Sequence, residues 1–313
     1  MCAPAAPSGL AGPEPRPSAQ AAEIVRGAYD LHVHINPDVI ERRIDDMALA
    51  QGHRERALSG FALKSHYTPT AERATLVSQL TGLDVIGAIT LNAPVGGMNA
   101  LAVEIAAREH ARIVWFPTFD AENEPLGRTA AKPGVPVPVW AKMQHELRDQ
   151  GFRPEPVRVV DEHGALLPEV HDVLRVIARH DLVLATGHLS RDEIFTLVRG
   201  AKEAGVKRIA ITHPEFPSQN IGLADQRALA ADGVLLERCF TTAHTGKVSW
   251  ETMFENIRGV GVEHSYVSTD LGQLGNPPCE DGMALMADKM LAAGFTPQEI
   301  HTMTVVNTRK LVR

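Results

Sequence analysis

The chain has 313 residues, of which 44% are hydrophobic and 22% are charged, and its formal net charge is -7 at pH 7. This composition is typical of a globular protein, and the length fits one large domain or two smaller ones. Because the charge is acidic and no long basic block is present, a surface that neutralises nucleic-acid phosphates is excluded, and we expect a small-molecule substrate.

The cysteines and the N-terminal run indicate the compartment. Cys2, Cys239 and Cys279 are odd in number, widely spaced and form no CxxC pair, which argues against a disulfide framework or a structural zinc knuckle. Residues 1–22 are rich in Ala and Pro but lack the basic start and apolar core of a signal peptide, so they predict a disordered tail. No run approaches the roughly 18 apolar residues of a membrane span. We expect a soluble, cytoplasmic protein without membrane partners, and a homo-oligomer stays open.

After the tail, short apolar runs of β type alternate with segments of helical period. The runs occupy residues 28–35, 60–67, 84–92, 112–119, 181–188, 208–214, 233–240 and 265–272. Helical segments include 70–80, 190–205 and 223–232, and in the second of these Ser190 and Glu193 have the capping-box spacing. Eight βα repeats predict a single TIM (β/α)8 barrel over residues 23–313. The rival fold is an open doubly wound sheet, which usually carries a GxGxxG loop that this sequence lacks.

One connection is unusually long. Residues 120–167 contain the run KPGVPVPV, a predicted helix at 140–151, and the letters DEHG at 161–164, which resemble a hairpin turn. Loops that follow barrel strands open onto the active-site mouth, so this insertion after the fourth strand predicts a lid or pocket wall, with a surface decoration as the alternative.

Polar side chains gather at the ends of the predicted strands. In the first run, alternation places Asp30, His32 and His34 on one face, opposite the apolar residues. Four further groups end other strands, namely His66, His188, His213 and Asp270. The carboxyl ends of barrel strands converge on one face, and imidazoles crowded with carboxylates need a cation. Such a ligand set suits Zn²⁺, Mn²⁺ or Fe²⁺.

Lys64 shares the inward face of the second run with His66. Burial and a neighbouring cation both lower the pKa of a lysine, so an ammonium is disfavoured there. Lys64 is therefore interpreted as a neutral base, as a carbamate that ligates the metal, or as a group outside the metal shell.

The ordered set of strand-end ligands resembles the amidohydrolase superfamily of metal-dependent hydrolases. The family pattern is an HxH ending strand one, single histidines ending strands five and six, and an aspartate ending strand eight. Here these positions hold "HVH" (His32 and His34), "ATGH" (His188), "ITHP" (His213) and "STD" (Asp270), and the match covers nearly the whole barrel. The stretches "DLHVHINPD" and "LKSHY" narrow the resemblance to an uncharacterised subgroup.

This sequence departs from the family at strand four. Binuclear members often bridge their metals there with a carboxylated lysine or a glutamate, whereas the fourth run here reads "VWFPTFD". Lys64 is the candidate replacement and Asp120 a weaker one. The resemblance therefore implies one or two divalent ions, of which zinc is the first choice, and leaves the number open.

Residue roles follow from metal activation of water. Asp270 is predicted to accept the proton of the water and deliver it to the leaving group, and His213 is free to polarise the substrate if it is not a ligand. His66 and Asn92 are candidates to bind the developing oxyanion or the substrate. Arg42 and Arg43 are candidates for a substrate carboxylate. Glu237 also faces inward on the seventh run, as a substrate contact or as part of a buried ion pair.

The leading hypothesis is a metal-dependent hydrolase that cleaves a C–N bond of a small molecule: an amide, a cyclic amide or an amidine. A metal-dependent decarboxylase on the same barrel is the first alternative. A phosphoesterase ranks lower, because the loops do not concentrate Lys and Arg, and a non-catalytic binding protein ranks last.

Overall fold

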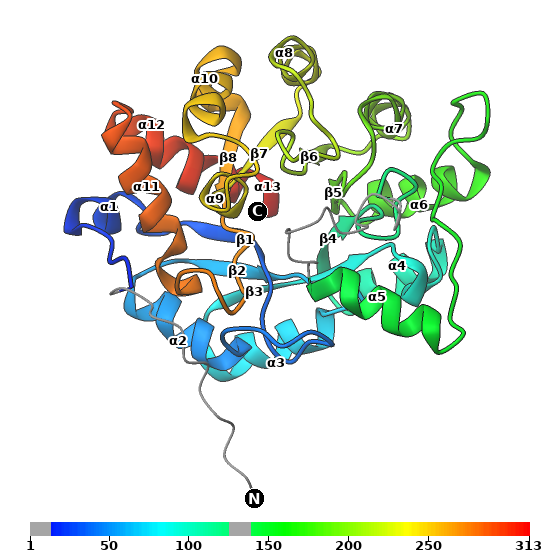
Figure 1. Cartoon of the computed structure of the whole chain (residues 1–313), viewed down its shortest axis with the longest axis horizontal. Helices are drawn as coiled ribbons and strands as arrows, with labels where there is room; N and C mark the ends of the chain where they lie inside the picture. Colours follow the sequence, from blue (N-terminus) through cyan, green and yellow to red (C-terminus); the bar gives the residue numbers. More distant parts are fainter. Residues whose placement is uncertain (1–13, 125–138) are drawn as a thin grey trace, which may run out of the picture.

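The computed structural model describes residues 14–124 and 139–313, and it shows eight parallel strands surrounded by helices (Figure 1). The strands are β1 (Tyr29–Val33), β2 (Gly60–Leu63), β3 (Asp84–Thr90), β4 (Ala111–Trp115), β5 (Val183–Ala185), β6 (Arg208–Ile211), β7 (Leu235–Cys239) and β8 (Ser265–Ser268). Their spatial order follows the order of the chain. Between the ends of β8 and β1, the Asp270 amide donates to the His32 carbonyl and the His34 amide donates to the Leu271 carbonyl. The predicted TIM barrel and each of its strands are confirmed.

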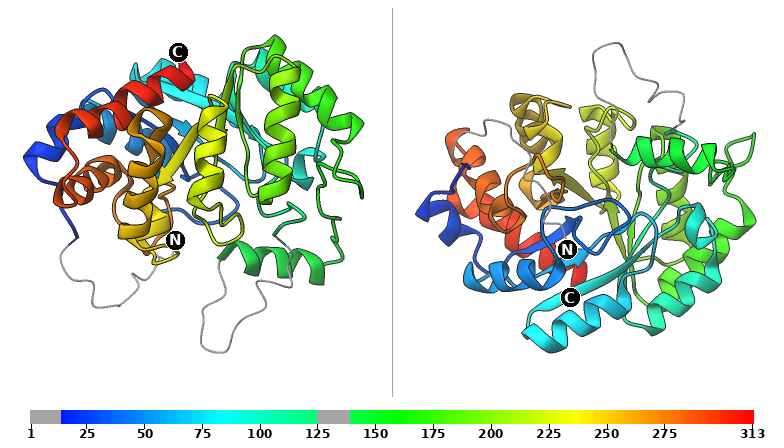
Figure 2. Two further views of the ribbon diagram at one scale, coloured as in Figure 1. Left: turned by 90° about the horizontal axis from the view of Figure 1, so that it is seen from above. Right: turned by 60° about the horizontal axis from the view of Figure 1, so that its bottom comes forward.

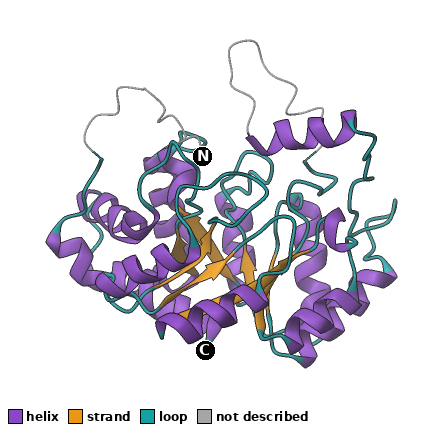
Figure 3. Ribbon diagram, turned by 90° about the horizontal axis from the view of Figure 1, so that it is seen from below, coloured by secondary structure: helices purple, strands orange, loops and turns teal. Residues whose placement is uncertain are grey.

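Helices cover the outside of the strands, as Figure 3 shows. They are α1 (Ala19–Ile24), α2 (Asp46–Glu55), α3 (Ala71–Thr81), α4 (Ala100–Arg108), α5 (Val139–Asp149), α6 (Pro168–Arg179), α7 (Arg191–Glu203), α8 (Leu223–Ala231), α9 (Phe240–His244), α10 (Trp250–Val260), α11 (Gly282–Ala292), α12 (Pro297–His301) and α13 (Asn307–Val312). Short 3₁₀ turns lie at Ala93–Val95, Val262–His264 and Cys279–Asp281, and a π-helical segment lies at Thr302–Val306. Figure 2 shows α8 and α10 side by side on the outer surface.

The helix that follows β5 begins as its sequence predicts. Ser190 caps α7 by accepting a hydrogen bond from the Glu193 amide, and the Glu193 carboxylate accepts one from the Ser190 amide. This reciprocal pair satisfies backbone donors that have no partner within the helix. It fixes the start of α7 immediately after the loop that carries His188.

Strand β1 departs from strict alternation. Its register with β2 shifts between Asp30 and Val33. Leu31 packs with the cluster inside the barrel, whereas Val33 packs with the layer between strands and helices. The prediction that Asp30, His32 and His34 share one face is therefore corrected, because an irregularity of this kind changes which side chains point inward. Asp30 accepts hydrogen bonds from the amide and hydroxyl of Thr269, and so ties β1 to the end of β8.

The N-terminal boundary also differs from the prediction. Helix α1 begins at Ala19, and the side chain of Ser18 caps it and donates a hydrogen bond to Asp288 of α11. The ordered chain thus extends before residue 23, while residues 1–13 of the predicted tail lie outside the described residues. No helix in the described ranges is long and apolar enough to cross a membrane.

The long connection after β4 is described in part. Helix α5 matches the predicted segment, and residues 125–138 lie outside the described residues. Val160 and Leu166 form an antiparallel bridge around the turn at 161–164, which confirms the hairpin. The Asp161 carboxylate accepts hydrogen bonds from the amides of His163 and Ala165 and so stabilises this turn.

Candidate metal centre

Three potential ligands converge where β1 and β8 end. Nε2 of His32 and Nε2 of His34 each lie 3.2 Å from the same carboxylate oxygen, Oδ1 of Asp270. His32 and His34 are almost fully buried, and the three ligand atoms form one compact group that could hold a metal ion. Unprotonated imidazole nitrogens facing a carboxylate would oppose lone pair to lone pair, so the group fits a cation.

The tautomer of His32 is set by a carboxylate behind it. Glu237 on β7 lies with Oε1 3.0 Å from Nδ1 of His32 and accepts a second hydrogen bond from Ser268. Burial alone would raise the pKa of Glu237, but the neighbouring His32 outweighs it and lowers that pKa to about 2. An ionised Glu237 makes Nδ1 the protonated nitrogen, which leaves the Nε2 lone pair for a metal.

Lys64 lies beside Nε2 of His32, the nitrogen whose lone pair is left for a metal. Its Nζ lies 2.7 Å from Nε2 of His32, and its side chain is 3% exposed. Burial lowers the pKa of Lys64, although the charges of Asp270 and Glu237 partly offset this effect. Lys64 Nζ therefore lies where a metal bound to Nε2 of His32 would be its close neighbour. Because two positive charges repel each other at that distance, metal binding requires Lys64 to be a neutral amine or to be converted to an anion.

His188 and His213 lie on the opposite part of the same site. Their ring centroids are 5.0 Å apart, and the His213 ring lies 6.0 Å from that of His32. Nδ1 of His188 is 3.4 Å from a carboxylate oxygen of Glu124, so its Nε2 is the nitrogen left for a ligand. Burial lowers the pKa of both histidines, and the neighbouring charge of His188 lowers that of His213 further. Neutral imidazoles are the form that binds metal.

His66 is positioned by a short chain of hydrogen bonds. The amide of Asn92 donates to the Thr118 hydroxyl at 2.7 Å, and that oxygen lies 2.9 Å from Nδ1 of His66. The Thr118 hydroxyl, which accepts from Asn92, is free to donate its own proton to Nδ1, and in that arrangement the His66 proton is on Nε2. Burial, followed by the neighbouring charge of His34, holds the pKa of His66 well below its usual value. His66 therefore offers a neutral N–H donor.

Two of the site residues have strained backbones. Asp270 has φ of 52° and His213 has φ of 24°, in the left-handed region that few non-glycine residues adopt. Such strain persists where the surrounding structure imposes it, and it is frequent at functional sites. The positive φ values of Asp270 and His213 are therefore consistent with a functional role that depends on the orientation of their side chains.

These residues line one cavity of about 500 Å³, which opens at the carboxyl ends of the strands. The predicted residues among its lining are His32, His34, Arg42, Lys64, His66, His188, His213 and Asp270. The other predicted substrate contacts, Asn92, Arg43 and Glu237, are not among its lining residues. Asn92 bonds the Thr118 hydroxyl, Arg43 donates to the Asn276 carbonyl, and Glu237 makes the buried pair with His32 that the sequence analysis gave as its alternative. Asp120, the weaker bridging candidate, instead binds the Ala93 amide.

The structure also adds residues that the sequence analysis missed. The Thr241 hydroxyl donates to Oδ2 of Asp270 at 3.0 Å, and the ring of Phe216 packs 4.7 Å from that of His213. Lys247 places its Nζ 4.8 Å from the Phe216 ring at the cavity wall. Thr241 comes two residues after the end of β7, a position where a polar residue could have been noticed. Phe216 and Lys247 carry no such signal, because loops bring them to the cavity.

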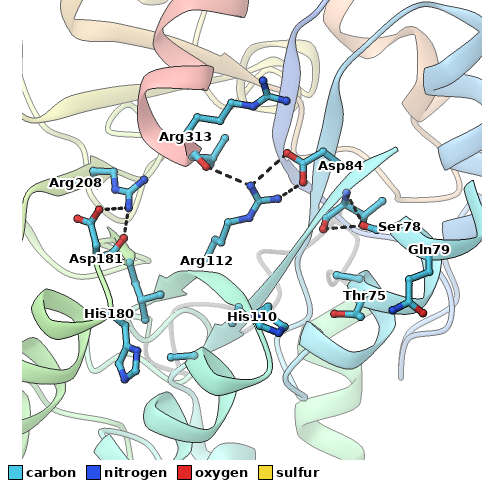
Figure 4. Close-up of a pocket in the computed structure, with 16 residues that line it drawn as sticks. Thr75, Ser78, Gln79, Asp84, His110, Arg112, His180, Asp181, Arg208 and Arg313 are labelled. Atoms are coloured by element: carbon cyan, nitrogen blue, oxygen red, sulfur yellow. Dashed lines mark hydrogen bonds and ion pairs between the residues drawn. The ribbon is translucent and has the colours of Figure 1, made fainter. Parts of the chain in front are cut away.

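A second cavity lies at the amino ends of the strands (Figure 4). Arg112 there bonds Asp84, and Arg208 pairs with Asp181. None of the predicted site residues lines this cavity. Barrel chemistry is located at the carboxyl ends of strands and stability at the amino ends, so we read these ion pairs as structural.

Comparisons with known proteins bear on the family and the fold. The model of a family described as "Family of unknown function (DUF6282)" matches residues 27–237, more than half of the chain. No curated protein sequence matches. An amidohydrolase from Pseudomonas aeruginosa has a similar structure, with a TM-score of 0.59 and 11% identity over 94% of this chain and 98% of that one. An organophosphorus hydrolase from Deinococcus radiodurans has a TM-score of 0.52 and 14% identity over 98% of this chain and 100% of that one. At the level of the fold, the resemblance to amidohydrolase barrels is confirmed.

Proposed function

The chain belongs to the family of unknown function DUF6282, and we propose that it is a metal-dependent hydrolase that cleaves a C–N bond of a small molecule. The observation that carries the proposal is the convergence of His32, His34 and Asp270, with both imidazole Nε2 atoms 3.2 Å from one carboxylate oxygen. Similar folds in an amidohydrolase and an organophosphorus hydrolase support a hydrolytic barrel.

In this proposal His32, His34 and Asp270 hold a divalent cation, most simply Zn²⁺, with Mn²⁺ and Fe²⁺ as alternatives. His188 and His213 complete its shell or bind a second ion. When bound, such a cation would lower the pKa of its water from the far higher value of bulk water to about 7 and polarise the carbonyl or amidine carbon under attack.

The protein's own groups handle the proton and the developing charge. Asp270 accepts the proton from the attacking water and returns it to the leaving nitrogen, while the Thr241 hydroxyl holds its second oxygen in place. The N–H at Nε2 of His66 donates to the oxyanion, and Asn92 acts through Thr118 to keep that proton on Nε2. His213 polarises the substrate when it does not bind metal.

Product analysis separates this function from its nearest rival. Metal-loaded protein is incubated with N-acyl amino acids, cyclic amides and amidines, and released amine, ammonia, ring-opened product and CO₂ are measured. Amine, ammonia or the ring-opened product of a cyclic amide, without CO₂, is the expected result. Release of CO₂ from a carboxylated substrate without C–N cleavage would instead establish the decarboxylase.

Glu237→Gln is expected to weaken metal binding by about ten- to a hundredfold, because a neutral amide no longer fixes the charge and tautomer of His32. The measurement is a competition titration against a chromogenic chelator. Glu203→Gln on the exposed side of α7 serves as the matched control. Equal affinity in the Glu237→Gln and Glu203→Gln proteins would remove Glu237 from the support of the metal.

Lys64 is proposed as a carbamate ligand. Its neutral amine adds to CO₂, forming an N–C bond and releasing one proton, and the product is an anion beside His32. Lys64→Ala is therefore expected to lose metal occupancy, with partial recovery when a short carboxylic acid such as acetate is added. Metal content is read by elemental analysis.

Lys247→Ala is the control for this experiment, because Lys247 lines the same cavity but contacts Phe216. The Lys247→Ala protein should keep its metal. If Lys64→Ala keeps its metal as well, Lys64 is not a ligand.

A further inference from the structure

The two neighbouring arginines after β1 have different surroundings. Arg42 lines the cavity and is 7% exposed. Arg43 is not among the lining residues, and its guanidinium is already used, donating from Nη1 to the Asn276 carbonyl at 2.9 Å and pairing through Nη2 with Glu14. Of this pair, Arg42 is therefore the better placed to bind a molecule in the cavity.

Arg42 is held rigidly by the loop that carries it. The Asn36 side chain donates to the Arg42 carbonyl at 2.9 Å and accepts from the Arg42 amide at 3.2 Å. This pair of bonds fixes the backbone at Arg42, and the loop itself is closed by a bridge between Asn36 and Asp45. A side chain positioned in this way loses little conformational entropy when it binds a ligand.

The guanidinium is clamped along one edge. Oδ2 of Asp38 accepts a hydrogen bond from Nε of Arg42 at 2.7 Å and forms an ion pair with Nη2 at 2.7 Å, and Oδ1 of Asp38 accepts from the Val39 amide. Nη1 of Arg42 has no hydrogen-bond partner among residues 14–124 and 139–313. A nearly buried guanidinium is stabilised by a further hydrogen-bond acceptor, and a ligand in the cavity could supply that acceptor to Nη1.

The donor that Arg42 leaves open favours an anion. Lys64 and Asp270 belong to the proposed metal site, and of the other charged lining residues Arg42 and Lys247 are basic while the exposed Glu41 is acidic. Asp38 balances the charge of Arg42, but an anionic acceptor forms a stronger, charge-assisted hydrogen bond with Nη1 than a neutral acceptor does. The lining also includes the apolar Ile40, Leu274 and Phe216, which suit a hydrocarbon body.

We propose that the substrate carries a carboxylate, which Nη1 of Arg42 binds while the scissile bond lies against His32, His34 and Asp270. This inference rests on the proposed function and names its substrate class. A carboxylate fits better than a phosphate, because Asp38 already uses Nε and Nη2, and a doubly charged group needs more donors than the rest of the guanidinium supplies.

Succinate and its neutral analogue succinamide test the proposal as a matched pair of probes. Binding to metal-loaded protein is measured by calorimetry, with metal content determined on the same samples. Wild type is expected to prefer succinate by about tenfold or more, and Arg42→Met to weaken succinate binding by about ten- to a hundredfold with little change for succinamide. Arg43→Met is the control and should behave as wild type.

A second variant protects the test against misfolding. Arg42→Met leaves Asp38 buried without its partner, so the double variant Asp38→Asn/Arg42→Met is measured beside it and should show the same loss. If wild type does not distinguish the two probes, or if both Arg42 variants bind succinate as wild type does, the proposal is wrong. A further outcome separates this proposal from the proposed function. If the wild-type protein binds succinate but no metal, and the Arg42 variants lose succinate binding, then the proposed hydrolase is wrong while Arg42 remains a carboxylate-binding residue.

Discussion

Replacing Asp270 with Asn is expected to lower kcat/KM by about 10²–10⁴-fold, the range typical for loss of a positioned proton-transfer group. The amide cannot accept the proton from water, and it is a poorer metal ligand than a carboxylate. Asn is also among the residues that best tolerate the left-handed backbone seen at position 270. The variant should therefore fold, and the loss should be chemical.

Two controls make the Asp270 result interpretable. Thr241→Val removes the hydroxyl that holds Oδ2 of Asp270 and should cost less than Asp270→Asn, because the carboxylate itself remains. Asp281→Asn alters an acid that pairs with Arg56 outside the cavity lining and should keep full activity. If Asp270→Asn turns over within a factor of about two of wild type, Asp270 does not transfer the proton.

Metal is expected to stabilise the fold through His34. At a free Zn²⁺ concentration about a hundred times the dissociation constant, binding to the native state alone adds about 2.7 kcal/mol to the free energy of unfolding. His34→Ala removes one of the three compact ligands, so added metal should then give little stabilisation. Urea unfolding with and without metal measures both values.

His171→Ala is the matched control, because His171 is an exposed histidine of α6. It should gain as much stability from metal as wild type gains. Equal stabilisation of the His34→Ala and wild-type proteins would show that metal binds elsewhere.

The barrel was predictable because its signal is local. Each strand is a short apolar run next to a helical segment, and the capping pair Ser190 and Glu193 is readable within four positions. The strand-end residues His32, His34 and Asp270 were predicted for a related reason: the barrel's topology brings the carboxyl ends of its strands together.

What the sequence could not reveal depends on loops and irregular pairing. The register shift in β1 turns the Asp30 side chain away from the face that the imidazoles of His32 and His34 share, and a period-two pattern does not show such a shift. Glu237 was expected inside the barrel, but its contact with His32 depends on how the far strand β7 approaches β1. Arg42 and Arg43 are adjacent in sequence, and only the folded loop separates their roles.

Crystals grown with Zn²⁺ and measured on both sides of its absorption edge would locate the ion in the structure. The expected result is an anomalous peak at about 2.0–2.2 Å from Nε2 of His32, Nε2 of His34 and an oxygen of Asp270. Well-ordered crystals of folded protein in which that position lacks a peak, or in which zinc binds only at other residues, would contradict it.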